Sequence, residues 1–237
     1  MTGEGPLTGD HQEATVGEPL PLFPLGTVLF PGMLLPLHVF EERYRTLMRD
    51  QQGRDPIFGV VLTSQGREVA DKPEIHRVGT AASLVAAGRY PDGRYDLVVR
   101  GGRRFRVLTQ DWGGDYLVAE IEWLGEPLGA SLESDELTVL ATQVDRHFER
   151  FLEAFELATS MNLPRERLPD SPNDLAYALC ARLPLDTRER QGLLEAASDR
   201  DRLTGLAEIL RRERDLLLTT GVGGSTVANP GAHFSAN

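Results

Sequence analysis

The sequence predicts an α+β fold, in which a β-rich first half is followed by a helical second half. Between residues 19 and 125, short apolar or alternating segments are separated by turn residues, as in a small barrel or folded sheet. Beyond residue 125, apolar residues recur at steps of three or four, which is the period of a helix with one buried side. The chain of 237 residues is long enough for two compact units of this kind.

The composition divides the chain into four segments. Residues 1–18 carry four acids, no Lys or Arg and no apolar run, so we expect a disordered lead and no secretory signal. Residues 19–125 form the β-rich part, and residues 126–218 form the helical part. Residues 219–237 are rich in small polar side chains without an apolar period, so we expect a disordered tail.

The stretch from Pro19 to Phe40 contains no Asp, Glu, Lys or Arg and is as apolar as a membrane span. Five prolines interrupt it, and a membrane helix would lose several backbone hydrogen bonds with no water to replace them. We therefore expect no membrane span. The stretch instead predicts three short buried strands, at 20–23, 27–30 and 33–37.

The rest of the β-rich part alternates between strand patterns and turns. One short helix is expected over residues 40–50. Pro91-Asp92-Gly93 and Gly101-Gly102 are both expected to be hairpin turns, because they supply residues that tolerate positive φ. Further strands are expected at 57–62, 80–86, 95–100, 105–110 and 116–123.

A bundle of about four helices is expected in the second half. The first helix is about 25 residues long, with one apolar stripe that runs from Leu137 to Phe155. Helix starts are indicated by Ser171-Pro172, by Asp186 and by Ser198, each followed at a short distance by an acid in the first turn. The last helix buries Leu203, Leu206, Leu210 and Leu217.

The overall charge disfavours nucleic acid as a partner. The formal net charge is −11 and the sequence pI is about 5.0, whereas nucleic-acid affinity depends on a basic surface. One local exception gives an RNA-binding alternative, namely a strip of arginines beside two aromatic residues: Arg100, Arg103, Arg104 and Arg106, with Tyr95 and Phe105. The alternation along residues 104–107 instead fits a strand whose arginines point outward.

The sequence assembles no catalytic, cofactor or metal site. Its single lysine, Lys72, precedes a proline and belongs to no phosphate-binding loop, and no serine-nucleophile motif is present. His38 is interpreted as a histidine that hydrogen-bonds a turn, because neither a nucleophile nor a metal partner accompanies it. A cryptic hydrolase is kept as an alternative. The lone cysteine, Cys180, predicts a buried, inert thiol and a reducing compartment, and we expect the cytoplasm.

Several segments together carry a family resemblance. They are Leu20–Leu25 (LPLFPL), Val28–Gly32 (VLFPG), Leu35–Glu41 (LPLHVFE) and Arg43-Tyr44, followed by shorter matches at 58–61, 78–80, 174–176, 183–185, 190–191 and 193–195. This pattern closely resembles the Lon protease N-terminal domain family over most of residues 19–218. The resemblance implies a six-stranded pseudobarrel of PUA-like topology with one short helix, followed by a helical bundle. It does not extend to the ATPase and protease modules of the full-length family members.

The resemblance implies a stand-alone, non-enzymatic module that binds unfolded or exposed apolar polypeptide segments in protein quality control. A separate ATP-dependent protease and a second copy of the chain are further candidate partners. We expect any binding surface in the groove between barrel and bundle, or on apolar side chains left exposed on the barrel. The candidate residues are Phe30, Met33 and Tyr44, with Arg43 and Arg45 at the rim.

Overall fold

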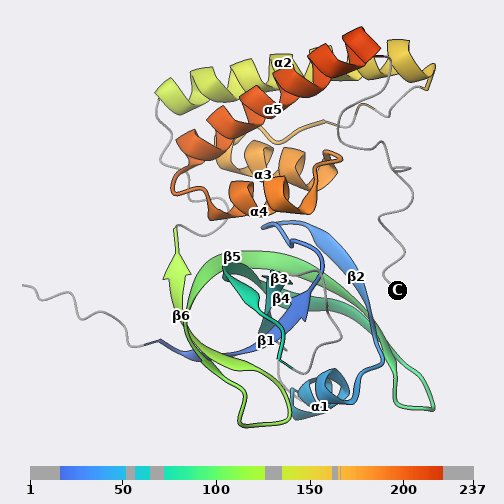
Figure 1. The fold of residues 1–237 in the computed structure, drawn as a ribbon, viewed down its shortest axis with the longest axis vertical. Coiled ribbons are helices and arrows are strands. Elements are labelled where there is room, and N and C mark those ends of the chain that lie inside the picture. Colours follow the sequence, from blue (N-terminus) through green and yellow to red (C-terminus); the bar gives the residue numbers. More distant parts are fainter. Residues whose placement is uncertain are drawn as a thin grey trace, which may run out of the picture.

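A computed structural model describes residues 17–51, 57–64, 72–125, 135–161, 165 and 167–220. It confirms the α+β class, with a curled six-stranded sheet beneath a layer of helices (Figure 1). The strands are β1 (Pro19–Leu25), β2 (Leu34–Val39), β3 (Ile57–Thr63), β4 (Ile75–Arg89), β5 (Tyr95–Asp111) and β6 (Val118–Leu124). The helices are α1 (Glu42–Asp50), α2 (Asp135–Thr159), α3 (Pro172–Arg182), α4 (Thr187–Glu195) and α5 (Asp199–Thr220). The lead and tail predicted at 1–18 and 219–237 lie almost entirely outside the described residues.

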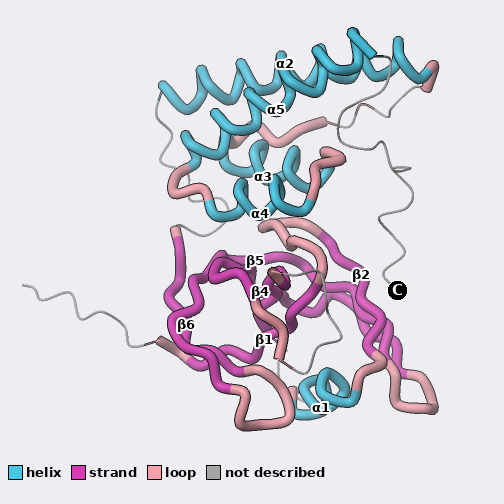
Figure 2. The backbone as a smooth tube through the Cα atoms, viewed as in Figure 1, coloured by secondary structure: helices cyan, strands magenta, loops and turns pink. Residues whose placement is uncertain are grey.

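The sheet closes into a barrel because β5 is long enough to pair with three strands. The strand order is β2-β5-β4-β3-β1-β6, and β5 also pairs with β6. Figure 2 shows the strands, in magenta, curled into a barrel. The pairing of β1 with β3 is parallel, and the other pairings are antiparallel. In the described part of the chain, β2 pairs only with β5, and this edge position explains how it accommodates Pro36.

Two sequence predictions about this region are wrong. Residues 27–30 are not a strand but part of the loop between β1 and β2. Gly101-Gly102 is not a hairpin turn, because the two strands predicted at 95–100 and 105–110 are a single strand, β5. The β1–β2 loop crosses β5 at this point, where the Gly101 N–H donates to Met33 O (2.9 Å) and the Gly32 N–H donates to Gly101 O (2.8 Å). The glycine pair therefore allows a close approach of two backbones.

The hairpin turn predicted at residues 91–93 is confirmed. It joins β4 to β5, and Gly93 has a φ of 85°, which favours glycine. The N–H of Gly93 donates to the carbonyl of Tyr90, and the N–H of Tyr90 donates to the carbonyl of Arg94, both at 2.9 Å. The turn thus fixes the far end of the β4–β5 ribbon.

The helical part also matches its sequence pattern. The first predicted helix is α2, with 25 residues. At the start of α4, the Asp186 carboxylate accepts a hydrogen bond from the Glu189 N–H (2.7 Å), and at the start of α5, Ser198 Oγ accepts one from the Asp201 N–H (3.1 Å). The predicted leucines of α5 are buried. Figure 1 shows α3 and α4 between the barrel and the outer pair α2 and α5.

Buried polar side chains join the helical layer to the barrel. Arg104 of β5 points out of the barrel, as the alternation predicts, but it is only 8% exposed and donates to Leu194 O (2.6 Å) and Ala196 O (3.0 Å). The reason is that the helices cover the outer side of β5 there. Gln191 of α4 donates to Val78 O (3.0 Å). These bonds fill the junction between barrel and bundle with protein–protein contacts.

A candidate polypeptide-binding face on the barrel

The two aromatic candidates from the sequence lie in the core. Phe30 is 0% exposed and packs with the helical layer, and Tyr44 of α1 is 3% exposed with its ring stacked on Phe23 at 3.8 Å. Neither side chain reaches the surface, because the loop that carries Phe30 and the buried side of α1 both face apolar clusters. This corrects our expectation that these rings are exposed.

The other three candidates are tied to neighbouring structure. Met33 is half-buried at the junction, where its sulfur lies 3.7 Å from Arg190 Nη2. Arg43 pairs with Glu41 at 2.7 Å and lies over the Tyr44 ring. Arg45 donates to the carbonyls of the 91–93 turn. The five predicted residues therefore do not form one exposed surface.

Exposed and half-buried apolar side chains gather on the outer side of β2, β4 and β5. Pro36, Val98 and Ala86 are partners in one row across the three strands, while the intervening residues, such as Leu37 and Leu97, fill the barrel core. Leu34 and Val85, at 48% and 52% exposure, flank this row. We call these five residues, Leu34, Pro36, Val85, Ala86 and Val98, the outer face.

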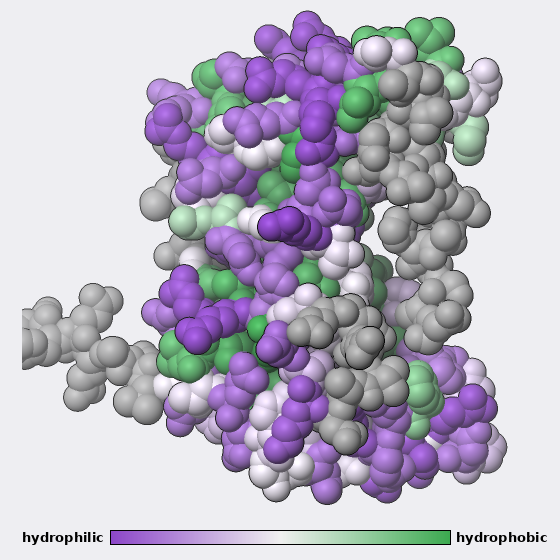
Figure 3. All heavy atoms as spheres, in the orientation of Figure 1, coloured by the Kyte–Doolittle hydropathy of each residue, from purple (hydrophilic) through white to green (hydrophobic). Residues whose placement is uncertain are grey.

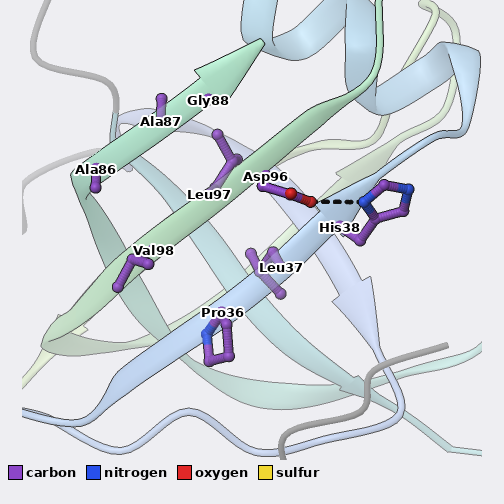
Figure 4. Close-up of a pocket in the computed structure, with 9 residues that line it drawn as sticks. All are labelled: Pro36, Leu37, His38, Ala86, Ala87, Gly88, Asp96, Leu97 and Val98. Atoms are coloured by element: carbon purple, nitrogen blue, oxygen red, sulfur yellow. Dashed lines mark hydrogen bonds and ion pairs between the residues drawn. The ribbon is translucent and has the colours of Figure 1, made fainter. Parts of the chain in front are cut away.

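The outer face is hollowed. Residues 36–38 of β2, 86–88 of β4 and 96–98 of β5 line a shallow depression of about 530 Å³ (Figure 4). Its β4 side consists of Ala86, Ala87 and Gly88, which carry a methyl group or no side chain and so leave the space open. On the side of the molecule seen in Figure 3, hydrophilic residues prevail and hydrophobic ones form smaller patches among them.

One end of the hollow is polar. Asp96 accepts a hydrogen bond from His38 (Nδ1 to Oδ1, 2.6 Å) and another from the Tyr90 hydroxyl (2.5 Å). The bond to His38 is the main cause that lowers the pKa of Asp96, and the bond to Asp96 raises the pKa of Tyr90. The half-exposed ring of Phe40 lies 6.1 Å from that of His38. The hollow thus combines apolar walls with one polar, aromatic end.

Arg45 positions this polar end. Its guanidinium donates to Gly93 O and Asp92 O, both at 2.9 Å, and pairs with Glu42 at 2.9 Å. The turn that carries Tyr90 is thereby held against α1. Arg45 thus acts on the outer face indirectly, through the hairpin.

The oriented imidazole has no nucleophile beside it. The residues that line the hollow include no Ser, Thr, Cys or Lys. Where the structure describes the chain, no group of three or more His, Cys, Asp or Glu side chains is arranged to hold a metal ion. In the same ranges, no helix is both long and apolar enough to cross a membrane.

The arginine strip is dispersed by the fold. Arg104 is buried in the junction, Arg106 pairs with Glu122 at 3.0 Å, and Arg103 donates to Gly125 O and lies over the Trp123 ring. Three of the four arginines are therefore engaged within the protein, which argues against a basic surface for RNA.

Sequence reasoning missed the outer face and the His38–Asp96 pair. The alternation in residues 34–39 and 95–100 indicates which side chains point out of the barrel, so the sequence contained the orientation of these residues but not their pairing. The pair joins residues 58 positions apart, and only the register of β2 on β5 brings them together.

Comparison with known proteins places the chain in a family. Residues 19–212 match the ATP-dependent protease La (LON) substrate-binding domain, and the chain belongs to this family. It is similar to Lon protease 2 of Syntrophobacter fumaroxidans, with 30% identity over 91% of this chain and 26% of the relative. It is also similar to Lon protease of Escherichia coli strain K12, with 28% identity over 84% of this chain and 25% of the relative. The chain thus spans about a quarter of the length of these relatives.

Two solved structures show the same fold. One is the Lon N-terminal domain protein from Xanthomonas campestris, with 31% identity, a TM-score of 0.58 and coverage of 81% of this chain and 98% of that chain. The other is the N-terminal domain of Mycobacterium avium complex Lon protease, with 21% identity, a TM-score of 0.61 and coverage of 82% and 98%. The fold and the family together define a substrate-recognition module.

Proposed function

We propose that the chain is a non-enzymatic protein-binding module that recognises unfolded or exposed apolar polypeptide segments in protein quality control. The observation that carries the proposal is the outer face, an apolar row of exposed and half-buried side chains across three strands, together with the hollow beside it. Contiguous exposed apolar surface is rare on a soluble domain without a partner. Membership of a substrate-binding domain family supports the same reading.

The shape of the outer face suits an extended segment. The hollow is shallow and open, and its walls come from strands that run side by side. A segment in extended conformation places alternate side chains on one side, so it can lay apolar side chains along this surface without a fixed sequence. This explains how one site can accept many different clients.

A pair of matched substitutions tests the proposal. Ala86→Glu puts a carboxylate into the hollow, whereas Leu157→Glu makes the same kind of change at a 77% exposed position of α2. We expect Ala86→Glu to weaken binding of an unfolded protein about tenfold or more, and Leu157→Glu to leave it unchanged. Equal binding by the Ala86→Glu variant and the unmodified protein would exclude the outer face.

The relatives are Lon proteases about four times longer than this chain, and they carry the domain as one part of the protease. This suggests that a protease is a partner of this chain. We propose that a separate ATP-dependent protease in the cytoplasm receives the clients that this chain binds. The degradation rate of an unfolded client by such a protease, with and without the chain, tests this point. A homodimer is a further proposal, and the molar mass in solution by light scattering decides it.

A further inference from the structure

At the polar end of the hollow, the contact with Asp96 requires a proton on Nδ1 of His38. An ionised carboxylate can only accept hydrogen bonds, so Nδ1 of His38 must be the donor in its 2.6 Å contact with Asp96. The second oxygen of Asp96 is occupied by the Tyr90 hydroxyl. A neutral imidazole that carries its proton on Nδ1 has a free lone pair on Nε2. In its neutral form, the ring held by Asp96 can therefore accept a hydrogen bond at Nε2.

This acceptor is available to a ligand. Figure 4 shows the ring of His38 at the edge of the hollow, with its second nitrogen turned away from Asp96. The His38 side chain is 35% exposed, and its only hydrogen bond to the described residues is the one through Nδ1. Two apolar residues of the outer face lie near it, namely Pro36, two positions earlier on the same strand, and Val98, the cross-strand partner of Pro36.

We propose that Nε2 of His38 accepts a hydrogen bond from a backbone N–H of an extended polypeptide whose apolar side chain lies over Pro36 and Val98. This inference rests on the proposed function and names the contact that orients the client. A backbone N–H is present in almost every residue, so the contact adds affinity without demanding a sequence. Asp96 is the positioning residue, because it keeps the proton on Nδ1.

The charged groups around His38 are already paired within the protein, so a neutral hydrogen-bond donor is the best match for Nε2. In the hairpin, Arg94 pairs with Asp92 and lies over the Tyr90 ring. At the start of α1, Glu41 pairs with Arg43, while Glu42 pairs with Arg45 and Arg49. These groups are compensated within the protein, and Asp96 is the carboxylate in contact with the imidazole.

The test uses the full chain and, as the probe, a fluorescently labelled globular protein that has been reduced and carboxymethylated so that it cannot refold. His38→Phe keeps a flat ring without an acceptor, and His38→Gln keeps an acceptor. We expect His38→Phe to weaken binding about tenfold at pH 8, and His38→Gln to stay within about threefold of the unmodified protein.

The outcomes separate this inference from the proposed function. If Ala86→Glu abolishes binding while His38→Phe binds as the unmodified protein does, the role of His38 is refuted and the outer face stands. Equal weakening by His38→Phe and His38→Gln would also refute it, because the acceptor that glutamine retains would then contribute nothing. If Ala86→Glu and His38→Phe both leave binding unchanged, the outer face itself fails. Thermal melting of each variant identifies any loss of binding that comes from unfolding.

Discussion

Arg104 on β5 and Leu194 on α4 are joined by a hydrogen bond of 2.6 Å between a guanidinium and a backbone carbonyl. Arg202 of α5 donates to the neighbouring carbonyl of Leu193 at 3.1 Å, and both arginines reach Ala196. The residue after α4, Ala196, does not take the left-handed conformation that usually satisfies the end of a helix. Arginines from a strand and from another helix take over this role and tie the barrel to the helices.

Removal of Arg104 should therefore destabilise the whole fold. Arg104→Ala removes the guanidinium donor to the carbonyl of Leu194 and one of the two donors to the carbonyl of Ala196, and we expect a loss of about 2–3 kcal/mol in the free energy of unfolding. Urea denaturation followed by circular dichroism measures it. Arg103→Ala is the control, since this exposed arginine should cost about 1 kcal/mol at most. Equal effects of the two substitutions would show that the junction does not depend on Arg104.

The two adjacent glycines of β5 should respond differently to alanine. A Cβ on Gly101 would collide with the backbone carbonyl of Phe30, whereas a Cβ on Gly102 would lie 3.3 Å from the carbonyl of Ala81. Gly101→Ala should cost about 2–3 kcal/mol, because a backbone cannot move aside cheaply. Gly102→Ala should cost about 1 kcal/mol at most. The melting temperatures of both variants decide this, and tolerance of Gly101→Ala would contradict the described crossing of loop and strand.

Asp96 should contribute to stability in a defined range of pH. Its pKa is lowered in the folded protein by the hydrogen bonds from His38 and Tyr90, so the folded state holds its proton less tightly than the unfolded state does. The contribution is fully present above the unfolded value of about 3.9 and is lost as the pH falls through the lowered value. Melting curves between pH 7 and pH 2.5 should show a smaller acid-induced loss for Asp96→Asn. An identical acid response would argue against this pair in solution.

Cys180 should be unreactive until the protein unfolds. The side chain is fully buried in α3, and burial raises the pKa of its thiol to about 12, so almost no thiolate is present at neutral pH. Ellman's reagent at pH 8 should label less than about a tenth of the native protein within an hour, and all of it in urea. Rapid labelling of the native protein would mean that α3 opens readily.

Local patterns predicted most of the elements. The four later helices follow from apolar periodicity and from the caps at Asp186 and Ser198, whose side chains bond as their spacing indicates. The turn at residues 91–93 follows from its Pro-Asp-Gly sequence. In these places the determinants lie within a few residues of each other, so the sequence alone contains them.

The errors occur where distant segments meet. Gly101 has the composition of a turn, but its role comes from a loop some 70 residues earlier that crosses the strand. Arg104 alternates with apolar residues as a surface arginine does, yet helices that begin far along the chain cover it. Phe30 and Tyr44 are candidate binding residues by sequence, but the same kind of long-range packing buries both rings. The pairing of His38 with Asp96 depends on strand register, which local pattern does not determine.

The most direct test of the central claim is a titration of this chain against one labelled protein in two states, folded and permanently unfolded, at several salt concentrations. Fluorescence anisotropy reports the binding. The proposed recognition of apolar segments predicts selective binding of the unfolded form, with little dependence on salt because the contacts are mainly apolar. Equal binding of both forms, no binding of either, or binding that disappears with salt would contradict it.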